Sequence, residues 1–112
     1  MADATHDPQL LKGLLSLVLL HLLAEQESYG YGVVSRLREE GIDVLEGTVY
    51  PALARLEREG RLSSRLVAST SGPARKYYRP TAAGYAELAR GTRSWRVLTQ
   101  TIGAVLDRPV PD

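Results

Sequence analysis

Basic side chains are concentrated in the middle of the chain, between Glu46 and Pro80. This stretch has seven basic residues against three acidic ones, a balance of +4, whereas Met1–Leu45 has three against seven, a balance of −4. The 112-residue chain as a whole carries a net charge of only +1. Cations gathered on one part of a nearly neutral protein favour a surface that binds a polyanion. Solvated charges without a partner are the alternative interpretation.

A helix is predicted over 46–59, with one apolar stripe and one polar face. The residues of the stripe follow the i, i+3, i+4, i+7 spacing of a buried helix face: Val49, Ala52, Leu53 and Leu56. Thr48, Tyr50 and Arg55 lie opposite, where hydrogen-bonding and cationic groups can reach base edges and phosphates. Pro51 is expected near the helix start, where its missing N–H matters least. These features are typical of a helix that enters the major groove of DNA.

Two short strands are predicted at 61–68 and 75–80, around a segment rich in Ser, Thr, Gly and Pro. The second strand carries Arg75, Lys76 and Arg79 beside the flexible tip of this hairpin. Cations in that position suit contact with backbone phosphates or with the minor groove.

Two further helices are predicted before this region. Asp7 caps a first helix that begins at Pro8 and runs to Leu23. Its apolar run is interrupted by Lys12, Gly13, Ser16 and His21, which favours a buried helix over a membrane span. After a break over 26–30, a second helix contains Val33, Val34 and Leu37 at helical spacing and ends at Gly41.

A last helix is predicted from Thr81, its cap, to a stop near Pro109. Apolar and small residues recur in it at spacings of three and four: Tyr85, Leu88, Thr92, Trp95, Thr99, Ile102 and Leu106. This heptad-like seam favours a partner helix from a second copy. Packing within one chain is the alternative.

The predicted order is three helices, a basic hairpin and one more helix, which is the order of a winged helix-turn-helix. The expected fold is therefore mainly α with a small β-hairpin and an added C-terminal dimerisation helix. We expect a DNA-binding domain over 1–80, with its first helix shared with the dimer interface. The dimerisation helix would span 81–108, and 109–112 would be a tail.

Several function classes find no support in the residues. The chain has no Cys, which suits a cytoplasmic protein and excludes thiolate metal sites. Neither His6 nor His21 has a partner at metal-ligand spacing. No Ser/His/Asp order and no glycine-rich phosphate loop is present. We therefore expect no enzyme activity, no metal and no cofactor.

Four segments, in this order, resemble the PadR family of transcriptional regulators from about Leu10 to Ala104. They are Leu11-Lys12-Gly13, Tyr29-Gly30-Tyr31, the run EGTVYPALARLEREG over 46–60 and the run GPARKYYRPTAAG over 72–84. The resemblance implies a winged-helix factor, usually a repressor, that dimerises through its C-terminal helix and binds a near-palindromic operator. It also implies that Lys12 and Tyr29 contact phosphates. The predicted DNA-binding residues are Lys12, Tyr29, Thr48, Tyr50, Pro51, Arg55, Arg75 and Lys76.

The chain departs from the family pattern at two positions. Leu45 stands where many relatives have Ser or Thr, so the hydroxyl cap of the 46–59 helix is lost, at a cost of about 1 kcal/mol unless Asp43 or another group replaces it. Pro80 stands where relatives often have Leu, and is expected to shorten the second strand of the hairpin.

Ser94-Trp95 is similar to a Ser-Trp pair in multidrug-binding members of the short branch of the family. The resemblance implies a flat cavity between the two Trp of a dimer, which a planar aromatic or hydrophobic effector could enter. The predicted interface and effector residues are Leu10, Leu14, Leu17, Leu88, Trp95, Leu98, Thr99, Ile102 and Leu106. A filled interface without a ligand is one alternative. An adaptor that kept the winged helix and lost DNA affinity is the alternative for the whole protein.

Overall fold

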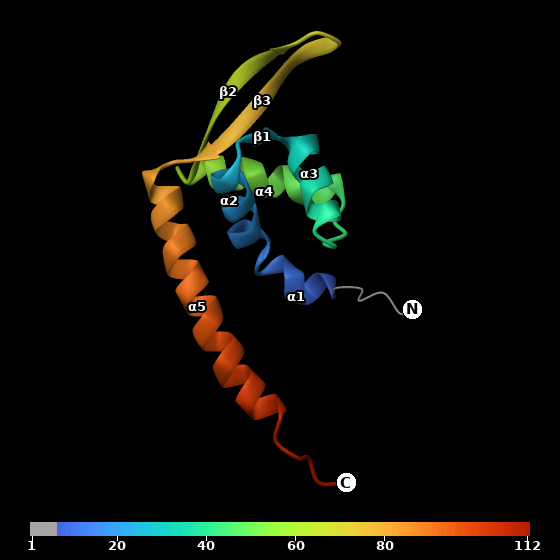
Figure 1. Cartoon of the computed structure of the whole chain (residues 1–112), viewed down its shortest axis with the longest axis vertical. Helices are drawn as coiled ribbons and strands as arrows, with labels where there is room; N and C mark the ends of the chain where they lie inside the picture. Colours follow the sequence, from blue (N-terminus) through green and yellow to red (C-terminus); the bar gives the residue numbers. More distant parts are fainter. Residues whose placement is uncertain (1–6) are drawn as a thin grey trace.

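The computed structural model describes residues 7–112, which form five helices and one three-stranded sheet. His6 and the other first residues of the domain predicted over 1–80 lie outside the described part. The elements, in chain order, are α1 Pro8–Lys12, α2 Leu15–Glu25, β1 Ser28–Tyr29, α3 Gly30–Glu39, α4 Glu46–Arg58, β2 Leu62–Ser69, β3 Gly72–Pro80 and α5 Ala82–Leu106 (Figure 1). The predicted fold class, a mainly helical winged helix-turn-helix with a C-terminal helix, is confirmed.

The first predicted helix is in fact two. Asp7 caps α1 as expected, because its carboxylate accepts a hydrogen bond from the Gln9 N–H at 2.8 Å. At Gly13, however, the chain turns, and the Leu14 N–H bonds to the Leu11 carbonyl at 2.9 Å instead of continuing the helix. The continuous helix predicted from Pro8 to Leu23 is therefore wrong. Glycine is among the weakest helix formers, and it breaks the run here.

The sheet has one strand more than the predicted hairpin. β1 pairs antiparallel with β3, with Ser28 opposite Tyr78 and Tyr29 opposite Tyr77. The strand order is β1-β3-β2, so β3 is central. The break predicted over 26–30 is thus partly a strand, which ties the start of α3 to the hairpin. We call β2, β3 and their connection the wing.

The core lies between α2, α3, α4 and the base of the wing. The predicted apolar stripes of α3 and α4 are confirmed, since Val33, Val34, Leu37, Val49, Leu53 and Leu56 are all buried. α2 supplies Leu15, Leu19, Leu20, Leu22 and Leu23 to the same core. α3 and α4 end as expected at Gly41 and Gly60, whose φ angles of 84° and 77° favour glycine.

Pro80 does not shorten the wing, contrary to the prediction. β3 extends to Pro80, which is buried and lies opposite Leu62 of β2. Because Pro80 is the last residue of its strand, and lies beyond the short pairing with β1, its missing N–H interrupts no ladder.

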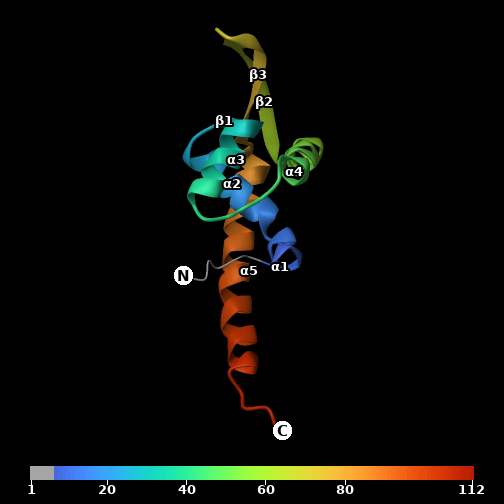
Figure 2. The ribbon, with the colours of Figure 1, turned by 90° about the vertical axis from the view of Figure 1, so that its right-hand side faces the viewer.

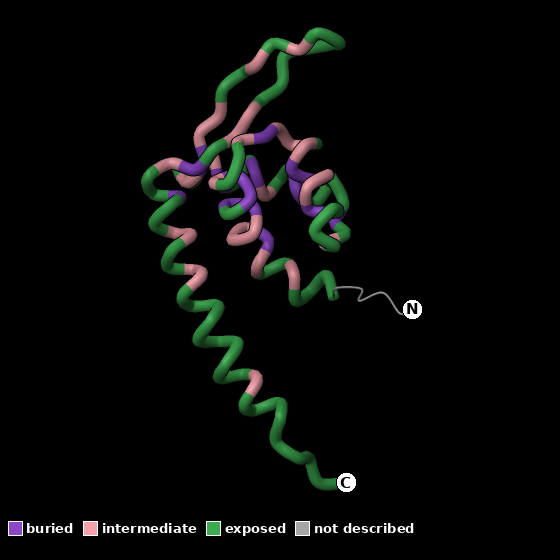
Figure 3. The backbone as a smooth tube through the Cα atoms, in the orientation of Figure 1, coloured by how far each residue is buried: buried purple, intermediate pink, exposed green. Residues whose placement is uncertain are grey.

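α5 extends away from the rest of the molecule (Figures 1 and 2). The first half of α5 packs on α2. From Arg93 onward, almost every residue of the helix is exposed, as the colours of Figure 3 show. The radius of gyration is 16.5 Å, whereas a compact chain of this length has about 13 Å. The helix begins at the predicted cap, since the Thr81 hydroxyl accepts a hydrogen bond from the Gly84 N–H at 3.1 Å. Within residues 7–112, no helix combines the length and apolar character of a membrane span.

Candidate nucleic-acid interface

The N-terminal end of α4 is held loosely by its own residues. Leu45, at the cap position, offers no side-chain hydrogen bond, as predicted. Pro51 lies inside the helix, in its second turn, and lacks the N–H that would bond to the Gly47 carbonyl. The helix begins at Glu46 as predicted, but at this position the missing N–H of Pro51 does cost one intrahelical bond. Packing of Val49 and Leu53 into the core holds this part of α4 in place.

Thr48, Tyr50 and Pro51 are exposed on α4, as a groove-entering face requires. Arg55 is exposed as well, but its guanidinium donates to the Ser16 hydroxyl of α2 at 2.7 Å. In this conformation Arg55 therefore connects α4 to α2. Arg58, which the sequence also places on the polar face of this helix, is exposed beside Arg55 in the last turn of α4.

A cleft of about 220 Å³ opens between the start of α3, α4 and the wing. The structure brings four predicted DNA-binding residues together in its lining: Tyr29, Tyr50, Arg75 and Lys76. Tyr31, Tyr78 and Gly30 complete the lining of this space, which we call the tyrosine cleft. The cleft therefore combines phenol groups with two cations, a set that can donate hydrogen bonds to phosphate oxygens.

Gly30 fixes the place of Tyr50 in this cleft. A Cβ atom on Gly30 would lie 2.1 Å from the Tyr50 Cε1 atom and 2.7 Å from its Cδ1 atom. The ring can lie against the start of α3 only because Gly30 has no side chain. Burial is also the main cause that raises the pKa of the Tyr50 phenol, with a smaller effect from Glu46. Tyr50 is therefore a neutral hydrogen-bond donor at physiological pH.

Alternation along β3 sends Arg75 and Lys76, the two cations that line the cleft, to opposite faces of the strand. The Arg75 guanidinium lies 4.6 Å from the centroid of the Tyr29 ring, which in turn is 5.3 Å from the Tyr77 ring. On this outer face, Arg65 of β2 pairs with Glu27 and lowers the pKa of that carboxyl. Arg75 is thus oriented by an aromatic surface and remains exposed.

Lys76 lies on the inner face, toward α4. Its Nζ atom is 2.8 Å from a carboxylate oxygen of Glu57 and 5.5 Å from the centroid of the Tyr78 ring. The Ser64 hydroxyl donates to the other oxygen of Glu57. The hydrogen bond from Lys76 is the main cause that lowers the pKa of the Glu57 carboxyl, and the bond from Ser64 is the second. In turn, the hydrogen bond to Glu57 raises the pKa of Lys76. Both groups are therefore charged at neutral pH.

Lys12 lies on α1, apart from the wing but near the N-terminal end of α4. Lys12 and Thr48 line one hollow of about 360 Å³, together with Asp43 and a mostly apolar set of neighbours. The two predicted DNA contacts thus share one end of the α4 surface, while the tyrosine cleft lies on its wing side.

The sequence interpretation missed Tyr31, Glu57 and Ser16. Tyr31 stands in the segment Tyr29-Gly30-Tyr31, which could have indicated it. Glu57 and Ser16 had no sequence signal, because their partners, Lys76 and Arg55, are distant in the chain.

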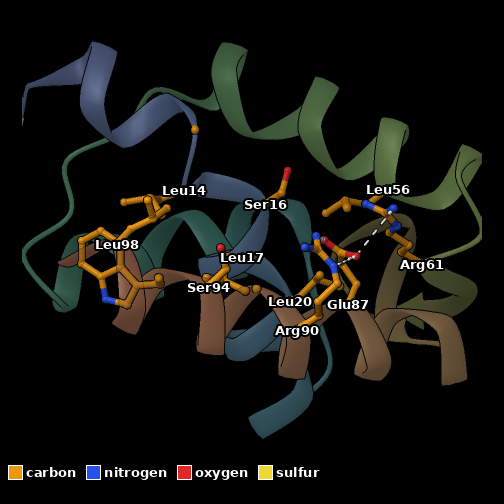
Figure 4. A pocket seen from close by; sticks show the side chains of 13 residues that line it. Leu14, Ser16, Leu17, Leu20, Leu56, Arg61, Glu87, Arg90, Ser94 and Leu98 are labelled. Carbon is orange, nitrogen blue, oxygen red and sulfur yellow. Dashed lines mark hydrogen bonds and ion pairs between the residues drawn. The ribbon is translucent and has the colours of Figure 1, made fainter. Parts of the chain in front are cut away.

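A second cavity, of about 230 Å³, lies between α2 and α5 (Figure 4). The predicted effector residues Leu14, Leu17, Trp95 and Leu98 line it, whereas Leu10, Thr99 and Ile102 do not. Its other end is charged. There a guanidinium nitrogen of Arg61 lies 3.7 Å from a carboxylate oxygen of Glu87, which also pairs with Arg90. The cavity is therefore apolar at one end and polar at the other.

Comparison with known proteins identifies the family. The model of the transcriptional regulator PadR-like family matches residues 19–90. This chain is a member of the PadR-like family. It is 38% identical over 86 residues to the transcriptional regulator Rv3488 of Mycobacterium tuberculosis, an alignment that covers 75% of this chain and 78% of the relative.

Solved PadR structures share the fold. A PadR family transcriptional regulator from Eggerthella lenta has a TM-score of 0.84 and 35% identity, covering 90% of this chain and 88% of its own. A PadR-like transcriptional regulator from Bacillus cereus has a TM-score of 0.79 and 35% identity, covering 90% and 99%. The PadR family and these relatives are transcriptional regulators and not enzymes, as predicted. The chain is therefore a winged-helix, DNA-binding transcriptional regulator of this family.

Proposed function

We propose that this PadR-family protein is a cytoplasmic repressor that binds a near-palindromic operator as a homodimer. In this proposal α4 enters the major groove with Thr48, Tyr50 and Pro51, and the wing contacts phosphates with Arg75 and Lys76. Tyr29 and Lys12 add phosphate contacts on either side of α4. The observation that carries the proposal is the convergence of Tyr29, Tyr50, Arg75 and Lys76 in one cleft beside the exposed face of α4.

We expect Lys76→Ala and Thr48→Ala to weaken DNA binding in different ways. Lys76→Ala should reduce affinity for all sequences similarly and make the salt dependence shallower by about one ion, because a phosphate contact is lost. Thr48→Ala should change the preference among base substitutions in the site by roughly 1–3 kcal/mol, because base contacts specify sequence. The measurement is a titration of a duplex from the region upstream of the protein's own gene, at two salt concentrations.

Parental behaviour of both variants would contradict the assigned surface. Binding by the parent that does not depend on salt, or no binding, would instead favour the adaptor function.

α5 supports the dimer. Leu88 packs against the core, and Trp95, Leu98, Ile102 and Leu106 continue the same stripe. Trp95 and Leu98 still line the cavity beside α2, whereas Ile102 and Leu106 do not. These four residues are 45%, 49%, 50% and 75% exposed, respectively. A second copy would cover this stripe with its own α5 and present a second α4, matching two half-sites about one DNA turn apart.

We further propose that a planar aromatic effector enters the cavity between α2 and α5 and releases the protein from DNA. Trp95 offers a stacking surface, and Arg61 and Arg90 could meet a polar or anionic substituent. The cavity also touches α4 through Leu56, and Ser16 in its lining accepts the hydrogen bond from Arg55. An effector that competes for the Ser16 hydroxyl would thus break the hydrogen bond that ties Arg55 of α4 to α2.

1-Anilinonaphthalene-8-sulfonate is a suitable probe, because it joins an aromatic body to an anionic group. We expect it to quench the fluorescence of Trp95, the only Trp, and to weaken operator binding. Trp95→Ala should bind the probe roughly tenfold more weakly, since the stacking surface is lost. Because this variant has no tryptophan, its binding is followed by the fluorescence of the probe itself, as is that of the control. Val97→Ala is the control, because Val97 lies on another face of the same helix. Equal binding of the probe to both variants would argue against this cavity.

A further inference from the structure

The contact between Glu57 and Lys76 joins α4 to the wing, at the position where the proposed function places a DNA phosphate. Glu57 is bound through both oxygens, one by Lys76 at 2.8 Å and the other by the Ser64 hydroxyl. Ser64 lies opposite Tyr78 in the sheet, so it stands on the same inner face as Lys76. The carboxylate is thus held in place by a neighbour that does not depend on Lys76.

The pair is accessible from outside. The Lys76 and Glu57 side chains are 49% and 30% exposed, and Lys76 lines the tyrosine cleft. A phosphate oxygen that enters the cleft would meet an ammonium group that already has an anionic partner. A lysine head group is a compact charge that can move between two anions by small rotations of its side chain.

We propose that Glu57 sets the DNA affinity of this protein by occupying Lys76 in the free state, so that a DNA phosphate must displace its carboxylate. This inference rests on the proposed role of Lys76 as a phosphate contact. Glu57 acts through Lys76 and touches no base. Ser64 retains the carboxylate when Lys76 leaves it, which keeps Glu57 available when the DNA dissociates.

Two other cations of the wing, Arg75 and Arg65, differ from Lys76 in their partners. Arg75 rests on the face of Tyr29, a contact without a competing negative charge. Arg65 has a carboxylate partner, Glu27, but on the outer face. Of the cleft-lining cations, Arg75 and Lys76, only Lys76 therefore exchanges one anion for another in this scheme.

Glu57→Gln tests the proposal because glutamine keeps the size and can still accept from Ser64. We expect this variant to bind a 30-base-pair duplex of mixed sequence about three- to fivefold more tightly than the parent, the range that a partly exposed ion pair can account for. The plots of affinity against salt should be parallel, since both proteins neutralise the same number of phosphates. In a Lys76→Ala background the gain should disappear.

Glu59→Gln is the matched control. It makes the same charge change two residues away, where a carboxylate oxygen of Glu59 lies 3.6 Å from a guanidinium nitrogen of Arg61. This control should alter the DNA affinity less than twofold. A gain for Glu57→Gln that persists without Lys76, a gain no larger than that of Glu59→Gln, or a loss of affinity would overturn the proposal. If the parent itself fails to bind the duplex at low salt, the proposed function fails together with it, an outcome distinct from the other three.

Discussion

Ile102→Asp is expected to leave a folded monomer whose operator affinity is at least about 100-fold below that of the parent. Ile102 lies in the exposed second half of the α5 stripe, and its side chain is 50% exposed among the residues that the structure describes. The substitution therefore removes no contact from the core. In a dimer, it would bury an unpaired carboxylate between two helices, which is strongly unfavourable. Losing the linked second half-site reduces apparent affinity by about 10²–10⁴-fold.

Sedimentation velocity and a mobility titration of the same samples measure both effects. Gln100→Asp is the matched control, because Gln100 lies on nearly the opposite face of α5 at 100° per residue. It should remain dimeric and bind as the parent does. A dimeric Ile102→Asp variant, or a monomer with undiminished affinity, would rule out dimerisation through this stripe.

Gly84→Ala is expected to destabilise the fold by about 3 kcal/mol, at the upper end of overpacking effects. Gly84 is the buried residue of α5, and a Cβ atom there would lie 2.1 Å from the Arg61 carbonyl oxygen. That oxygen cannot move freely, since it accepts a hydrogen bond from the Thr81 N–H at 3.1 Å. The added methyl group must push α5 away from the base of the wing. Thermal unfolding should shift downward by roughly 10 °C.

Gly47→Ala provides the comparison for this measurement. Nothing lies within 4 Å of a Cβ atom at Gly47, and alanine favours helix over glycine by up to about 1 kcal/mol. This variant should unfold at the parental temperature or slightly above it. Equal unfolding temperatures for the two variants would mean that the joint between α5 and the wing tolerates a side chain at Gly84.

The elements that the sequence predicted correctly are those with a long apolar period or a local cap. Val49, Leu53 and Leu56 define α4 to within one residue of its observed end, and Asp7 and Thr81 cap helices through contacts two or three residues away. β1 could not be predicted in this way. It has two residues, and it exists only because β3 returns beside it.

In the candidate site, too, the sequence predicted the features that depend on one element and missed the contacts between elements. The exposed face of α4 follows from helical periodicity, and Tyr29 came from the family resemblance. The contact of Arg55 with Ser16 joins residues 39 positions apart, and the contact of Lys76 with Glu57 crosses from strand to helix. Such pairs depend on how elements pack together, which periodicity within one element does not determine.

The loose start of α4 has a consequence for its local stability. Without a side-chain cap at Leu45 and without the N–H of Pro51, the first two turns have few hydrogen bonds that must break for them to open. Gly47, Thr48 and Val49 add little intrinsic preference for helix. Val49 is the one fully buried side chain of the first two turns, whereas Leu53 and Leu56 together hold the last two turns against the core. Local opening should therefore begin at the end of α4 that carries Thr48 and Tyr50, and ordering that end belongs to the free energy of binding.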